Sequence, residues 1–160
     1  MHRRITEERS LHIASLFICL ILLCLGFIVS ACNVEKKIPQ VMYETYKTEL
    51  MENSFVKKVK LSFIRPQLTI EAYVSSIVTD EDTGIVLDAT KTFVTVDKMT
   101  DIAEYAKGGN PILYVSLKIF DNDGLLLKEY MARYFKTSQA SDFSPENIDG
   151  YKTWREVTNN

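Results

Sequence analysis

Two neighbouring stretches of the chain alternate between apolar and polar side chains, and they constrain the fold more than any other feature of the sequence. The apolar positions are Val59, Leu61 and Phe63 in the first stretch and Leu68, Ile70, Ala72 and Val74 in the second. Successive side chains of a strand point to opposite faces of a sheet, so this period of two predicts strands over 55–64 and 68–75, each with one apolar face. Because Arg65-Pro66 interrupts the pattern, we expect the two strands to pair antiparallel across a tight connection.

A second hairpin is predicted near the C-terminus. Strand-like runs over 112–120 and 125–135 flank the sequence Asp-Asn-Asp-Gly, and Asp-Gly between such runs is a strong hairpin signal. The same four residues resemble the start of a calcium loop. Such a loop needs its glycine at the sixth position, whereas Gly124 is at the fourth and is followed by the apolar Leu125, so we interpret the segment as a turn.

Helices are expected before and between the two pairs of strands. Residues 39–53 carry a modest apolar stripe with proline at the start, which favours a helix, with a strand as the alternative. Acidic residues at 80–82 suit a helix N-terminus. An apolar face then continues over 82–107 and ends before Gly108-Gly109, as helices commonly do. We interpret 82–107 as one long helix or two abutting helices, with the β-branched residues of 92–96 as the weak point.

The expected order is therefore helix, two strands, helix, two strands. This order predicts a small α+β domain, in which an antiparallel four-stranded sheet packs one face on one long helix, with an additional N-terminal helix. The tail after Lys136 is polar and is expected to be loop-like, with Phe143 and residues 151–154 anchoring it to the domain.

The first 31 residues are of a different kind. Arg3, Arg4 and Arg9 precede an almost entirely apolar run from Leu11 to Ala31. A basic start, an apolar stretch and small residues at its end are typical of a secretory leader. The run is also long enough to cross a bilayer, for which about 20 residues suffice, so a retained transmembrane anchor is the alternative.

The end of the apolar run favours cleavage over retention. Val29, Ser30 and Ala31 are followed directly by Cys32. These four residues resemble the lipobox of bacterial lipoproteins, in which an aliphatic residue and two small residues precede the cysteine that receives diacylglycerol. The resemblance covers only the leader. It implies a signal peptide over 1–31, a lipidated cysteine and short spacer over 32–39, and a single exported domain over 40–160.

The resemblance and the charges of the leader together predict where the domain lies. Basic residues that precede an apolar segment stay in the cytoplasm, so residues 33–160 face outward whether the tether is lipid or helix. We expect the protein on the outer face of the cytoplasmic membrane, anchored through lipid on Cys32, with the outer membrane as the alternative.

The composition of the exported part excludes several kinds of chemistry. All three cysteines lie at or before position 32, and both histidines, His2 and His12, lie in the leader. A domain without His or Cys lacks the groups for a Ser-His-Asp triad, a Cys nucleophile or a usual zinc site, so we expect neither metal nor cofactor. Without the three arginines and two glutamates of the leader, 16 basic and 19 acidic residues remain, a net charge of −3. Nucleic-acid binding usually needs a basic face, and we expect none.

These observations favour a non-catalytic binding or assembly module at the cell envelope, with an unidentified envelope protein or ligand as its partner. The candidate binding surface comprises Lys58, Lys60 and Tyr73 on the open sheet face and Tyr151 and Trp154 in the tail. One alternative is a cell-wall or glycan hydrolase that works with paired carboxylates, for which Glu71 and Glu129 are the candidates. The other is a subunit of an envelope complex that keeps its N-terminal transmembrane anchor.

Overall fold

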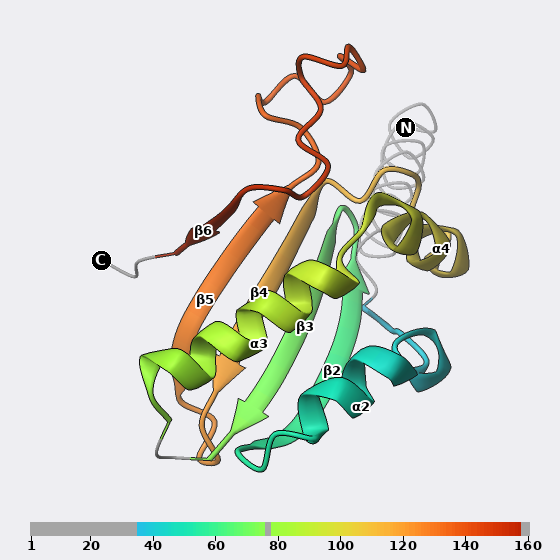
Figure 1. Cartoon of the computed structure of the whole chain (residues 1–160). Helices are drawn as coiled ribbons and strands as arrows, with labels where there is room; N and C mark the ends of the chain where they lie inside the picture. Colours follow the sequence, from blue (N-terminus) through green and yellow to red (C-terminus); the bar gives the residue numbers. More distant parts are fainter. Residues whose placement is uncertain (1–34, 76–77, 158–160) are drawn as a thin grey trace, which may run out of the picture. The chain divides into compact units, whose positions relative to one another are not determined.

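A computed structural model of the chain describes residues 35–75 and 78–157, and these form one sheet with helices across one of its faces (Figure 1). The elements are β1 (Lys36–Lys37), the 3-10 helix η1 (Gln40–Met42), α2 (Glu44–Met51), β2 (Val56–Ile64), β3 (Gln67–Val74), α3 (Asp80–Phe93), α4 (Val96–Ala106), β4 (Tyr114–Phe120), β5 (Leu126–Arg133) and β6 (Trp154–Glu156). The predicted leader and lipobox lie outside the described residues.

The two predicted hairpins are confirmed. Strands β2 and β3 pair antiparallel with Leu61 opposite Ile70, and β4 and β5 pair antiparallel with Leu117 opposite Tyr130. These four side chains are buried, because the alternation that predicts the strands also turns their apolar residues to one face.

The prediction of a four-stranded antiparallel sheet is wrong. The sheet has six strands in the order β1-β2-β3-β4-β5-β6, and its central pair, β3 and β4, is parallel, with Ile70 beside Leu117. The reason is the helical segment between the two hairpins, which carries the chain back along the sheet so that β4 starts at the same end as β3. A long crossover of this kind is what a parallel pair requires. The edge strands β1 and β6 are two and three residues long, too short to show a period in the sequence.

The prediction of one long helix is also wrong, and the alternative of two abutting helices is the arrangement that the structure has. Thr79 and Asp82 form a reciprocal cap at the start of α3, with the Thr79 Oγ1 accepting from Asp82 N at 3.2 Å and the Asp82 carboxylate accepting from Thr79 N at 2.8 Å. The helix ends at Phe93, within the β-branched segment expected to be weak. Thr95 then caps α4 by accepting a hydrogen bond from Lys98 N at 3.2 Å, so a second helix starts where the first one ends.

The helix α4 ends before Gly108-Gly109 as predicted, but the residue that ends it is not a glycine. The residue in the left-handed conformation is Lys107, with φ 51°, and the N–H groups of Lys107 and Gly108 bond back to the carbonyls of Glu104 and Ala103. Gly108 is needed for space, because a β-carbon there would overlap the ring of the buried Phe63.

The core lies between the sheet and its helices. Only the second half of the predicted N-terminal helix is α-helical, as α2, and its Tyr46 reaches α3. There it hydrogen-bonds Thr90 at 2.7 Å and stacks on Phe93 with ring centroids 4.5 Å apart. One face of every central strand is therefore closed by apolar packing, and the opposite face of the sheet stays uncovered by α2 and α3 (Figure 1).

Candidate functional site

We call the face of the sheet turned away from α2 and α3 the open face. Its residues alternate in sequence with those of the core and come from five strands. They include Lys58 and Lys60 of β2, Glu71 and Tyr73 of β3, Lys118 and Phe120 of β4, Glu129, Met131 and Arg133 of β5, and Arg155 of β6. The same period of two that builds the core thus sets a row of charged and aromatic side chains on the other side.

At the β2–β3 end of the open face, the structure brings three predicted residues together. The ammonium groups of Lys58 and Lys60 lie 5.6 Å and 4.7 Å from the centroid of the Tyr73 ring, which stacks on Phe120 at 5.3 Å. Lys60 also contacts the Tyr73 hydroxyl at 3.1 Å and Glu71 at 3.4 Å. The hydrogen bond to Tyr73, together with the charge of Glu71, raises the pKa of Lys60 above its ordinary value, so its amine stays protonated and is a poor base.

The two predicted residues of the tail lie elsewhere. Tyr151 is buried, 3 % exposed, and its hydroxyl donates to the Ile112 carbonyl at 2.6 Å, while its backbone takes the left-handed conformation at φ 65°. Trp154 pairs with Ala132 and packs against the core on the helix side of the sheet. The structure therefore presents neither ring on the open face, and it does not bring them near Tyr73.

The carboxylates considered for hydrolysis are on the open face, but each is engaged. Glu71 and Glu129 face the same side on either side of Lys118, roughly 10 Å apart from the strand spacing. Glu71 contacts Lys60, and Glu129 accepts from Ser116 at 2.7 Å with Lys118 at 3.8 Å. Acid and base catalysis on a glycoside needs two carboxylates across a cleft that holds the sugar. The hollow described next reaches neither of them.

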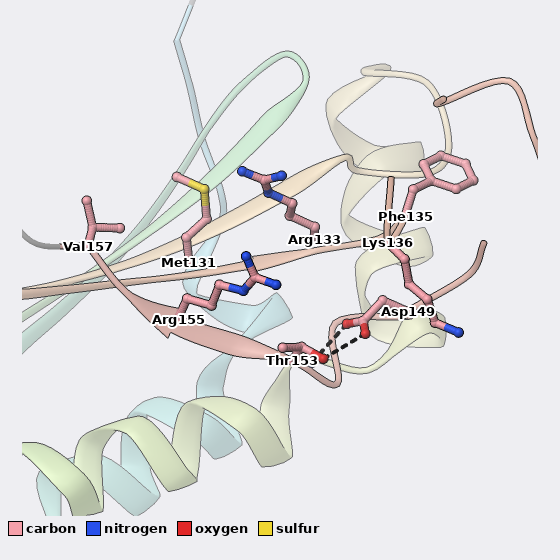
Figure 2. Close-up of a pocket in the computed structure, with 8 residues that line it drawn as sticks. All are labelled: Met131, Arg133, Phe135, Lys136, Asp149, Thr153, Arg155 and Val157. Atoms are coloured by element: carbon pink, nitrogen blue, oxygen red, sulfur yellow. Dashed lines mark hydrogen bonds between the residues drawn. The ribbon is translucent and has the colours of Figure 1, made fainter. Parts of the chain in front are cut away.

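A hollow of about 500 Å³ lies at the other end of the open face, between β5, β6 and the segment around residue 149 (Figure 2). We call it the β5–β6 hollow. It is lined by Met131, Arg133, Phe135, Lys136, Asp149, Thr153, Arg155 and Val157. Figure 2 shows the side chains of Met131, Arg133 and Arg155 on the side of the strands away from α3.

The residues of this hollow were not predicted as a site from the sequence, for an identifiable reason. Glu129, Met131 and Arg133 alternate along β5, so their common face was readable from the strand pattern. The position of Arg155 could not be predicted in this way, because a strand of three residues is too short to show an alternating pattern and the tail around it was expected to be loop-like. The turn that brings β6 beside β5 contains two consecutive residues with positive φ, Gly150 and Tyr151. Positive φ is common for glycine and uncommon for tyrosine, so only Gly150 suggests a turn in the sequence.

The described residues offer no site for a metal and no membrane-spanning element. Within 35–75 and 78–157, no group of three or more His, Cys, Asp or Glu side chains is arranged to hold an ion. In the same part of the chain, no helix has the length and apolar character needed to cross a bilayer. A shallow hollow along α2 is lined by Glu44, Glu49 and Glu52, but all three come from one side of one helix, so no opposing wall is present there.

Comparison of the chain with family models, with curated proteins and with solved structures gives no match.

Proposed function

We propose that the protein is an exported lipoprotein, held by lipid on Cys32 at the outer face of the cytoplasmic membrane, that acts as a non-catalytic binding module. Its ligand or partner docks on the open face of the sheet. One observation carries this proposal: the sheet has a face free of α2 and α3, and that face contains a hollow of about 500 Å³. Pockets that bind small molecules are typically about 300–1,000 Å³.

The construction of the open face supports binding. Its side chains stand on paired strands of one sheet, so their spacing is fixed by backbone hydrogen bonds and by the core behind them. Sites built on strands are held more accurately than sites on loops. Aromatic rings and cations alternate across the face, as in Tyr73 with Lys58 and Lys60, and tyrosine and arginine are enriched where proteins bind partners.

The short spacer supports a position close to the membrane. Lys36, the first residue of β1, is four positions after Cys32, with only three residues between them. An extended chain spans at most about 3.5 Å per residue, so a lipid on Cys32 would hold the first strand within roughly 14 Å of the anchored residue. A partner of this domain would therefore be an envelope component or a ligand that reaches the membrane surface.

In-cell cross-linking followed by mass spectrometry tests both parts of the proposal. The native protein and Cys32→Ser are compared, and the N-terminal peptide is read in the same data. We expect a native N-terminus that begins at a lipid-modified Cys32, together with a partner captured only by the anchored form. An intact leader peptide in the native protein would refute the lipoprotein assignment in favour of a retained anchor. A partner captured equally by both forms would show that anchoring does not serve binding.

A further inference from the structure

The β5–β6 hollow carries positive charge without the pairing found on the rest of the open face. Lys60 and Lys118 each have a carboxylate, at 3.4 Å and 3.8 Å. Arg133, Lys136 and Arg155 line the hollow, and none of them forms an ion pair with any residue in the described part of the chain. Two unpaired arginines thus stand at one end of a face on which the two central lysines are neutralised, while the side chain of Lys136 points away from them (Figure 2).

Asp149 is the single carboxylate among the lining residues, and it is hydrogen-bonded by its neighbour Thr153 and not by a cation. Both oxygens of Asp149 accept hydrogen bonds from Thr153, one from its backbone N at 2.9 Å and one from its hydroxyl at 2.8 Å (Figure 2). Lys136 donates to the backbone carbonyl of Glu146 at 2.9 Å, which fixes its position without cancelling its charge. The hollow therefore keeps an excess of positive charge.

The strands place the two arginines for joint use. Arg155 of β6 is directly beside Met131 of β5, and Arg133 is two residues further along β5 on the same face. The Arg133 guanidinium also lies 5.8 Å from the centroid of the Tyr114 ring, which favours its present orientation. A guanidinium presents a planar fork of donors that matches a carboxylate or a phosphate, so two of them from neighbouring strands suit one anionic group.

The remainder of the lining is apolar. Met131 and Val157 are half-buried, so the hollow has accessible apolar surface beside its cations, whereas Phe135 is 4 % exposed and contributes little to it. A ligand that consists of a charged group alone would leave this apolar surface in contact with water, whereas an attached ring or alkyl group would bury it, which is favourable.

We infer that the β5–β6 hollow binds a small anionic ligand with an apolar group. Arg133 and Arg155 hold its phosphate or carboxylate, and the apolar group lies against Met131 and Val157. This inference rests on the proposed binding function and adds the chemical class of the ligand to it.

Methyl NMR of the full chain in neutral detergent tests the inference, because Met131 lines the hollow. The protein is labelled with [methyl-¹³C]methionine and titrated with phenyl phosphate, with phenylacetate and with the neutral 2-phenylethanol. We expect one or both anions to shift the Met131 signal saturably, and the tighter one identifies the head group. The exposed Met51 and the buried Met99 should stay in place and serve as references for non-specific binding and for folding.

Variants locate the binding group. Arg133→Gln and Arg155→Gln should each weaken binding of the anion at least tenfold, whereas Lys91→Gln, which removes an exposed cation of α3 on the other side of the sheet, should change it less than twofold. The inference is overturned if neither anion moves the Met131 signal, if 2-phenylethanol binds as tightly as the anions, or if the arginine variants bind like the native chain with Met99 unchanged. Any of these results would leave the anchored binding module, which cross-linking tests separately, unaffected.

Discussion

Replacing Thr90 by valine should destabilise the protein more than replacing Tyr46 by phenylalanine, although both changes remove the same hydrogen bond. The Tyr46 hydroxyl and the Thr90 Oγ1 are 2.7 Å apart, and the two residues are 3 % and 0 % exposed. The Thr90 hydroxyl also donates to the Val86 carbonyl at 2.7 Å. Its one proton is used there, so Tyr46 is the donor and Thr90 the acceptor.

The two changes therefore leave different groups behind. Thr90→Val strands the buried hydroxyl of Tyr46 without an acceptor, and an unsatisfied buried polar group costs about 1–3 kcal/mol. Tyr46→Phe removes the hydroxyl itself and leaves Thr90 bonded to Val86, so only the net value of the bond is lost, about 0.5–1.5 kcal/mol. The double variant contains no stranded hydroxyl, so its loss should be smaller than the sum of the two single losses.

Urea unfolding followed by the fluorescence of Trp154, the one tryptophan of the chain, measures these differences. Tyr105→Phe is the matched control, because Tyr105 is 51 % exposed on α4 and its hydroxyl loss should leave the free energy of unfolding unchanged. Additive losses in the double variant, or a larger loss for Tyr46→Phe than for Thr90→Val, would refute the donor assignment and the importance of the contact between α2 and α3.

Two further predictions concern the packing and the titration of the core. Gly108→Ala should lower the free energy of unfolding by about 1–3 kcal/mol, because the added β-carbon overlaps the ring of Phe63. Gly84→Ala is the control: it lies in open space within α3 and should raise the free energy of unfolding by about 0.5–1 kcal/mol. Equal effects of the two changes in chemical denaturation would contradict the steric role of Gly108. Burial raises the pKa of Tyr46 and Tyr151 above the ordinary value of 10.0, so the unfolded chain releases these protons first and stability should fall as the pH rises above about 10. Tyr46→Phe should reduce that fall in a pH series of melting temperatures, and an unchanged slope would show that Tyr46 is not the group responsible.

The local sequence pattern was sufficient to predict most helices and strands, but it was not sufficient to predict how they assemble into the sheet. The alternation around Leu61 and Ile70 predicts β2 and β3 within a residue or two, and the acidic residues at 80–82 predict the start of α3 within two residues. Whether two hairpins meet in parallel depends on the path of the chain between them. That path changes direction at Val94 and Thr95, where α3 ends and Thr95 caps α4. The sequence predicted only a weak point in a helix at this place.

The candidate site divides in the same way. Lys58, Lys60 and Tyr73 were found because they lie on two long strands with a clear period. One wall of the β5–β6 hollow is formed by β6, which follows the turn at Gly150 and Tyr151. That turn is held by the Tyr151 hydroxyl, which bonds the carbonyl of Ile112, 39 positions earlier in the chain. No periodicity reports such a long-range contact, so Arg155 could not be grouped with Arg133 from the sequence.

Site-specific photo-cross-linking in cells tests the central claim, that the open face is the binding surface, most directly. A photoreactive residue is placed in the full chain at Met131 or at Tyr73 on the open face, or at the exposed Asp88 of α3 on the helix side. The account predicts adducts of reproducible mass from at least one open-face position and none from position 88. Adducts that form only from position 88, or equally from all three positions, would contradict it.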